Sequence, residues 1–132
     1  MDKQLQAAAS VFKALSDPTR LRILGLLLTG EVCVCHIHET LRISQPKASR
    51  HLAYLRAAGL VDARRDGLWM HYKLSDLPDP VLQSIAEMVR HELTHLDTVQ
   101  KDTGRLQKKT GCCVPSVEST DLPCCAARSE QM

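Results

Sequence analysis

Residues 44–59, with the sequence SQPKASRHLAYLRAAG, decide the fold of this chain. Three apolar residues recur there at the spacing of one helical face, and they predict its buried side: Ala48, Leu52 and Leu55. Ser44 is suited to cap the first turn, and Gly59 is typical of the residue that follows a helix. The stretch therefore predicts a helix with one buried side and a basic outer side.

A shorter helix is predicted directly before this one, over residues 33–41. Its inward positions are Val34, Ile37 and Leu41. The connection between the two helices, residues 42–44, is only about three residues long. Two helices joined so tightly, the second with a basic outer face, predict a helix-turn-helix.

After Gly59 the pattern changes to a period of two, and Asp66-Gly67 is a strong signal for a hairpin turn. The register expected from a two-residue turn at that point is Arg65 with Leu68, Arg64 with Trp69 and Val61 with Tyr72. Arg64 would then be able to stack on the Trp69 ring. The predicted fold class is mainly α with a β-hairpin, in a winged helix-turn-helix.

Helices are also predicted on both sides of this unit. Residues 3–15 have one apolar stripe, formed by Leu5, Ala8, Phe12 and Leu15. Asp17-Pro18 is a start signal for an apolar helix over residues 18–29. Asp79-Pro80 repeats that signal ahead of one long helix to about Thr103, with apolar residues near heptad spacing: Leu82, Ile85, Val89, Leu93, Leu96 and Val99. So long an amphipathic helix needs a partner, so we expect a homodimer formed through the N-terminal and the long C-terminal helices.

The helical periodicity ends at Gly104. We therefore expect residues 1–103 to form a winged helix-turn-helix DNA-binding and dimerisation domain, and residues 104–132 to form a flexible tail. The distinctive content of this tail is two pairs of cysteines, which are Cys112, Cys113, Cys124 and Cys125.

The composition fits one domain in a reducing compartment. Of the 132 residues 44% are hydrophobic, and no apolar run approaches the roughly 20 residues of a membrane span. The polar N-terminus is unlike a signal peptide, so we expect a cytoplasmic protein with no membrane partner. The six cysteines are then expected to be ligands or redox thiols and not disulfides.

Positive charge is concentrated in the predicted DNA-binding unit. Residues 42–73 hold seven Lys and Arg against two Asp, whereas the rest of the chain holds ten basic and thirteen acidic side chains. A basic segment inside an otherwise acidic chain is expected where a protein contacts phosphates, so double-stranded DNA is the predicted partner. A solvated charged face is the alternative.

The candidate DNA-binding residues share the outer face of the second helix or the tip of the hairpin: Ser44, Gln45, Lys47, Ser49, Arg50, Tyr54, Arg64 and Arg65. Gln45 and Arg50 can make bidentate contacts with base edges in the major groove. Ser44 and Lys47 suit phosphates, and the two hairpin arginines suit contact with the DNA backbone or the minor groove. His51 lies at the boundary of the buried stripe and is expected to be structural.

Four segments carry a family resemblance: residues 12–24, 33–35, 44–52 and 66–67. They resemble the ArsR/SmtB family of metal-responsive repressors, over residues 10–75, and residues 31–35 (EVCVC) are similar to the cysteine box of the arsenical-resistance repressors. The resemblance implies a regulator and not an enzyme. It implies a homodimer that represses its own operon at an inverted-repeat operator and dissociates when an inducer binds.

Cys33 and Cys35 are the candidate inducer ligands. Soft thiolates select thiophilic ions, which agrees with the arsenite or antimonite inducer that the resemblance implies. On a regular helix, residues two apart point about 200° apart. Both thiols can share one ion only if the helix start is irregular or unwinds, so coordination is expected to distort the first helix of the helix-turn-helix and to tilt the second.

The third ligand is left open by the sequence. The arsenical-resistance repressors often have a third cysteine where this chain has His38, and trivalent arsenic usually takes three sulfurs. The alternatives are two thiols alone, His38, a separate site in the tail, or a tail thiol from either protomer: Cys112, Cys113, Cys124 or Cys125. His36 is expected to take no part.

Three other functions stay open. A zinc- or cadmium-responsive repressor is one, since His38 and a further thiol would complete a four-ligand set with the cysteine pair. His91 and His95 would alternatively form half of an intersubunit zinc site, near Glu92 and Asp97. A thiol-redox-responsive repressor is the second. The third is a small thiol reductase, for which the chain lacks a Cys-x-x-Cys motif.

Overall fold

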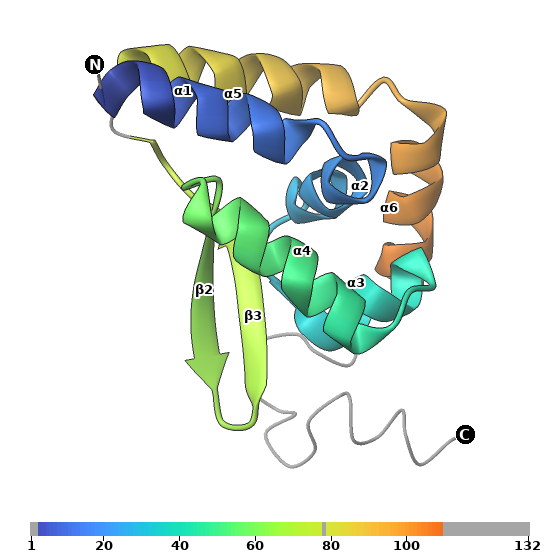
Figure 1. Cartoon of the computed structure of the whole chain (residues 1–132). Helices are drawn as coiled ribbons and strands as arrows, with labels where there is room; N and C mark the ends of the chain where they lie inside the picture. Colours follow the sequence, from blue (N-terminus) through green and yellow to red (C-terminus); the bar gives the residue numbers. More distant parts are fainter. Residues whose placement is uncertain (1–2, 78, 110–132) are drawn as a thin grey trace.

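The structure is a computed structural model and describes residues 3–77 and 79–109. Its elements in chain order are α1 (Lys3–Leu15), α2 (Pro18–Leu27), β1 (Val32–Cys33), α3 (Val34–Leu41), α4 (Gln45–Ala57), β2 (Val61–Asp66), β3 (Trp69–Leu74), α5 (Pro80–Leu93) and α6 (Asp97–Lys109). Figure 1 shows α3 and α4 near the β2–β3 hairpin, α1 beside α5, and α6 packed against α2 and α3. This arrangement confirms the predicted winged helix-turn-helix. The four cysteines of the predicted tail lie outside the described residues.

The helix-turn-helix is held by a cap, a tight turn and its core. Ser44 Oγ accepts a hydrogen bond from Lys47 N at 3.2 Å, which satisfies an amide left open at the start of α4. Arg42 adopts a left-handed conformation, with φ of 60°, where α3 ends. Ile43 N then donates to His38 O at 3.1 Å and closes the turn. The predicted core positions of α4 are fully buried: Ala48, Leu52 and Leu55.

The hairpin forms, but the register predicted for it is wrong by two residues. The turn is Gly67-Leu68, because Asp66 already pairs with Trp69. Gly67 has φ of 64°, which suits the first central position of a type II′ turn, where glycine is preferred. The observed pairs are Arg65 with Met70, Arg64 with His71 and Val61 with Leu74. Because the shift is an even number, each side chain keeps its predicted face of the sheet.

The sequence does not predict β1, which completes a three-stranded sheet in the order β1-β3-β2. In this sheet Val32 pairs with Tyr72 and Cys33 pairs with His71. A strand of two residues is too short to show a periodic pattern, so only the pairing with β3 defines it. The pairing joins the cysteine segment directly to the wing.

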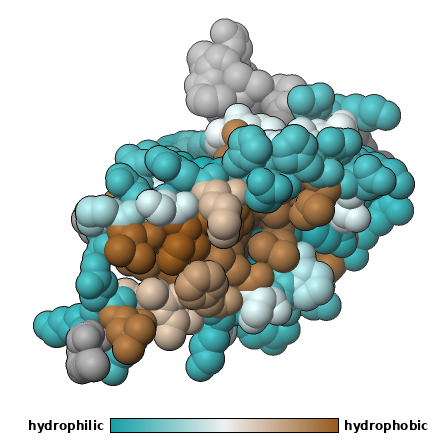
Figure 2. Space-filling model, turned by 90° about the horizontal axis from the view of Figure 1, so that it is seen from above, coloured by the Kyte–Doolittle hydropathy of each residue, from teal (hydrophilic) through white to brown (hydrophobic). Residues whose placement is uncertain are grey.

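The apolar stripe predicted for α1 is divided between the core, on which Ala8 and Leu15 pack, and the surface. Val11 and Ala14 are fully buried, whereas Leu5 and Phe12 are exposed. Helix α5 also exposes Val81 and Met88. Seen from above, apolar residues gather on the face of the molecule that α1 and α5 form (Figure 2). An exposed apolar patch of this kind marks an interaction surface.

The single long helix predicted from Asp79 to about Thr103 is wrong, because the chain bends between α5 and α6. Thr94 ends α5, and its Oγ1 donates to His91 O at 2.7 Å. Helix α6 then packs on α2, where Val99 Cγ1 would lie 2.7 Å from a Cβ added to Gly25. Gly104 lies inside α6, which continues to Lys109. None of the described helices combines the length and the apolar character needed to cross a membrane.

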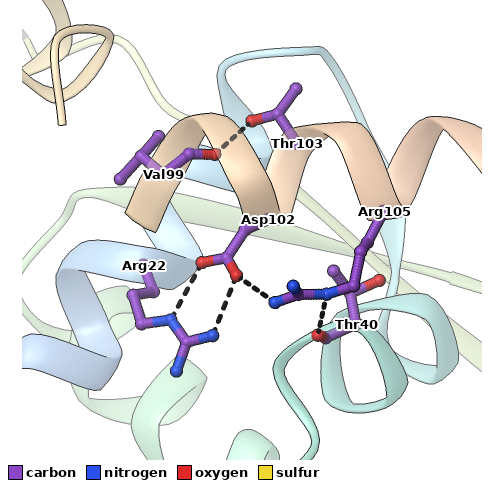
Figure 3. Close-up of polar contacts among 6 residues, drawn as sticks. All are labelled: Arg22, Thr40, Val99, Asp102, Thr103 and Arg105. Carbon is purple, nitrogen blue, oxygen red and sulfur yellow. Dashed lines mark hydrogen bonds and ion pairs between the residues drawn. The ribbon is translucent and has the colours of Figure 1, made fainter. Parts of the chain in front are cut away.

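A buried ion-pair network fixes α6 to the domain (Figure 3). The Asp102 carboxylate is 0% exposed and accepts hydrogen bonds from Arg22 Nε and Nη2, both at 2.8 Å. Arg105 Nη2 also donates to Asp102, at 2.6 Å, and Arg105 Nε donates to Thr40 O at 3.3 Å. The network therefore connects α2, α6 and the C-terminal end of α3.

Candidate DNA-binding surface and thiol site

Helix α4 presents its predicted DNA-binding side chains on one outer surface. Gln45, Lys47, Arg50 and Tyr54 are exposed, and Ser49 is half-buried. Gln45 Nε2 donates to Ser49 Oγ at 3.5 Å across one turn of the helix. The N-terminal half of α4 therefore carries amide, hydroxyl and guanidinium donors, the groups that read base edges and phosphates.

Arg20 extends this surface and was not singled out by the sequence. Its guanidinium lies 4.0 Å from the centre of the Tyr54 ring, in cation–π contact. Its Nε donates to Ala14 O at 2.8 Å, and its Nη1 lies 3.4 Å from His51 Nδ1. Burial, followed by the nearby Arg20 and other cations, lowers the pKa of His51, although Asp17 opposes the shift. His51 thus joins α2 to α4, which agrees with the structural role predicted for it.

The wing arginines are exposed, but Arg64 is already engaged. Arg64 Nη2 and Nε donate to the two carboxylate oxygens of Glu31 at 2.6 and 3.1 Å. His71 is the cross-strand neighbour of Arg64, so the predicted stacking on Trp69 is wrong. The hydrogen bond from Arg64 is the main cause that lowers the pKa of Glu31. The sequence gives no signal for this pair, because 33 residues separate its members.

The two candidate thiols meet at the junction of β1 and α3. Cys33 is 2% exposed and Cys35 is 4% exposed, and their Sγ atoms are 3.0 Å apart. Cys33 has the extended conformation of an N-cap, with φ of −72° and ψ of 144°, and its Sγ accepts from Cys35 N at 3.4 Å. Only Cys35 is inside the helix. The expected angle of about 200° between the thiols therefore does not arise, and no unwinding is needed to bring them together.

The two sulfurs are close to each other but are not bonded to each other. The separation of 3.0 Å from Cys33 Sγ is too long for a bond between these two sulfurs, since a disulfide measures about 2.05 Å. Metal ligation needs deprotonated, reduced sulfur. Ion binding at this site therefore requires both sulfurs in the reduced form.

The two histidines near the thiols do not complete a metal-binding group with them in the described part of the chain. His36 is buried, at 1% exposure. His38 is half-buried, with its Nδ1 3.2 Å from Ile43 O in the turn before α4. Within residues 3–77 and 79–109, no three or more His, Cys, Asp or Glu side chains are arranged to hold a metal ion. The structure thus does not bring His38 together with both thiols in such a group.

The alternative zinc site on α5 is also incomplete. His91 and His95 are exposed, with ring centres 5.2 Å apart in an edge-to-face arrangement. His91 Nδ1 lies 3.3 Å from Glu92 Oε2. Asp97 begins the next helix, α6, and the four residues do not form a metal-binding group in the described part of the chain.

The fold, the basic surface of α4 and the wing define a winged helix-turn-helix DNA-binding protein. Residues 17–63 match the model of the bacterial regulatory proteins of the arsR family. The chain is 43% identical over 97 residues to the arsenical resistance operon repressor of Escherichia coli strain K12, which covers 72% of this chain and 83% of that protein. The chain belongs to the arsR family, as its resemblance to the ArsR/SmtB repressors implies.

Two further similarities describe the range of this family. The chain is 39% identical over 85 residues to a Staphylococcus aureus protein described as a cadmium resistance transcriptional regulatory protein CadC homolog, covering 64% of this chain and 69% of that protein. It also matches the solution structure of a homodimeric winged helix-turn-helix DNA-binding domain from Mycobacterium bovis, a possible ArsR-family regulator. That match has a TM-score of 0.57 and 35% identity, and covers 71% of this chain and 88% of the other. The relatives are transcriptional regulators, which argues against the thiol reductase alternative.

Proposed function

We propose that this protein is a homodimeric repressor that binds an inverted-repeat operator and releases it when Cys33 and Cys35 bind trivalent arsenic or antimony. The observation that carries this proposal is the pair of buried sulfurs, 3.0 Å apart, at the start of the helix-turn-helix. Thiolates are the ligands that thiophilic ions prefer. The similarity to a relative described as an arsenical resistance operon repressor supports the same inducer.

The DNA contacts divide between α4 and the wing. Gln45 and Arg50, exposed on the N-terminal half of α4, would read base edges, while Ser44, Lys47 and Ser49 would hold phosphates. Tyr54 and the two wing arginines, Arg64 and Arg65, would contact the backbone. Two copies of α4, related by a two-fold axis, would then read the two halves of an inverted repeat.

The exposed α1–α5 face is the proposed dimer interface. Leu5, Phe12, Val81 and Met88 are each about half or more exposed, at 63, 53, 49 and 55%. Large apolar side chains gathered on one face are typical of an interface between subunits. The similarity to a homodimeric domain of the same family supports this assignment.

The spacing of the sulfurs suggests how the ion acts. An ion with sulfur bonds of about 2.3 Å separates its two sulfurs by about 3.4 Å in the pyramidal geometry of trivalent arsenic and by about 3.8 Å in tetrahedral geometry, and both values exceed the 3.0 Å between Cys33 and Cys35. Coordination would therefore push the first turn of α3 away from β1. The opposite end of α3 leads into α4 through the tight turn closed by the hydrogen bond from Ile43 N to His38 O, and the two helices pack on each other. Movement of α3 would consequently change the position of the recognition helix on its half-site.

The test is operator release by trivalent arsenic, trivalent antimony, cadmium and zinc, with reduced protein. Wild type is compared with Cys33→Ser, Cys35→Ser and a truncation after Thr110. Loss of the arsenic response in both serine variants, with unchanged operator affinity before addition of the ion, is expected. A retained response in both variants would refute the proposed site. Loss of the response in the truncation, in addition to its loss in both serine variants, would place the third ligand among Cys112, Cys113, Cys124 and Cys125.

The close pair of sulfurs favours one second candidate, a repressor that responds to thiol oxidation. Peroxide would then release the operator without any metal ion, and a reductant would restore binding. Zinc or cadmium as inducer is the other alternative, supported by the cadmium-resistance relative, and the comparison of four ions decides it.

A further inference from the structure

One row of side chains crosses the whole sheet from the thiol segment to the wing. Cys33 pairs with His71 on β3, and His71 pairs with Arg64 on β2. Residues directly opposite each other in an antiparallel pair project from the same face of the sheet. Glu31 lies two residues before Cys33, and its side chain reaches across β3 to the Arg64 guanidinium.

The Arg64 guanidinium is occupied on all three of its nitrogens. Nε and Nη2 donate to the two Glu31 oxygens at 3.1 and 2.6 Å, and Nη1 lies 4.0 Å from Asp66 Oδ2. This two-point pairing uses the same edge of the guanidinium that binds a phosphate. Two carboxylates therefore lie beside the Arg64 guanidinium before DNA binds.

We propose that Glu31 is a positioning residue that masks Arg64, so that DNA must displace the Glu31 carboxylate before Arg64 binds a phosphate. This inference rests on the proposed contact between Arg64 and DNA. The exchange is feasible because the side chains of Arg64 and Glu31 are 50% and 28% exposed, and water screens an exposed ion pair. DNA phosphates offer the guanidinium the same bidentate geometry without the adjacent carboxylate.

The masking residue belongs to the segment that carries the thiols. Glu31 is joined to β1 through the backbone, and β1 ends at Cys33. A displacement of β1 at the thiol site would therefore also change the ion pair between Glu31 and Arg64. The wing would then be the second element, beside α4, whose DNA contact depends on this segment.

The test measures DNA affinity as a function of salt for Glu31→Gln, with an operator duplex and a random duplex, by fluorescence anisotropy on the full-length reduced protein. Asp62→Asn is the matched control, because it removes one exposed acid from the same wing. Glu31→Gln is expected to raise the affinity for both duplexes about three- to tenfold. It should also steepen the slope of log K against log salt by about one, since one more phosphate is neutralised. Asp62→Asn should tighten binding less and leave that slope unchanged.

An Arg64→Ala background separates masking from the general effect of removing a negative charge. In this background Glu31→Gln should tighten DNA binding no more than Asp62→Asn does. If Arg64→Ala alone weakens neither duplex, both the proposed wing contact and the masking are overturned. If Arg64→Ala weakens both duplexes but Glu31→Gln matches Asp62→Asn or weakens binding, the masking alone is overturned. Equal circular dichroism spectra and melting temperatures show that each variant is folded.

Discussion

Replacing Asp102 by asparagine tests whether the buried carboxylate holds α6 on the domain. The substitution keeps the size of the side chain and removes its charge. In the native protein this carboxylate accepts three charge-assisted hydrogen bonds, two from Arg22 at 2.8 Å and one from Arg105 at 2.6 Å (Figure 3). The asparagine can satisfy only part of this set, because its NH2 group is a donor and faces at least one of the three donors.

The expected loss in the free energy of unfolding depends on how deeply the Asp102 carboxylate and the two arginine side chains are buried. Hydrogen bonds to charged groups contribute about 1.5–3 kcal/mol each, and breaking a buried ion pair costs about 3–5 kcal/mol. Two features reduce that cost: burial of the carboxylate itself is unfavourable, and the side chains of Arg22 and Arg105 are 30% and 34% exposed, so water can solvate them. We expect Asp102→Asn to lower the free energy of unfolding by about 2–4 kcal/mol.

Urea unfolding, at one fixed protein concentration because the protein is expected to be a dimer, measures this change. With a urea dependence of about 2 kcal/mol per molar, the midpoint should fall by about 1–2 M. Asp97→Asn is the control, since it removes an exposed acid at the start of the same helix and should cost at most about 1 kcal/mol. Equal midpoints for Asp102→Asn and wild type would refute the claim that the network anchors α6.

Four further results are expected. Arg50→Ala should reduce the preference for operator over random DNA by about 1–3 kcal/mol in binding assays, and a uniform loss on both DNAs would contradict base reading. Gly25→Ala should destabilise the protein by about 1–3 kcal/mol, because the new Cβ would lie 2.7 Å from Val99 Cγ1, and a melting temperature equal to that of wild type would count against this close approach. Met88→Asp should convert the dimer to a monomer in analytical ultracentrifugation; a persistent dimer would exclude the α1–α5 interface. Because burial lowers the pKa of His51, the unfolded chain binds its proton more tightly, so stability should fall as the pH falls through about 6.5, and His51→Gln should flatten that dependence in unfolding curves.

The sequence predicts best those features whose signal lies within one turn of chain. Asp17 and Asp79 cap α2 and α5 as predicted, each accepting hydrogen bonds from backbone amides two or three residues further on. Ser44 does the same for α4. Such contacts join residues that are close together in the sequence, so the sequence alone predicts where these helices begin. The hairpin turn lies one residue away from its prediction, because Gly67 occupies the first central position of the turn and not the second.

The boundary between α5 and α6 depends on contacts that local sequence does not contain. The apolar spacing continues from Leu93 through Leu96 to Val99, so it predicts one helix. In the folded chain Leu96 is 47% exposed, whereas Val99 is 3% exposed against Gly25. Packing on α2, more than seventy residues earlier in the chain, thus selects the bend. The exposure of Leu5 and Phe12 on α1 also depends on a contact outside the local sequence, because the proposed dimer interface would cover both side chains.

The thiol site shows most clearly what long-range pairing adds to a motif. Read as helix, Cys33 and Cys35 point apart, and they can share an ion only if the helix start is irregular or unwinds. The pairing of Cys33 with His71, 38 residues later, makes Cys33 part of a strand and leaves Cys35 in the first turn of α3. The two sulfurs are thereby brought together while belonging to different elements: one to the sheet of the wing, the other to the helix-turn-helix. Any ligand that alters the distance between them must move one of these elements relative to the other, and both are proposed to touch DNA.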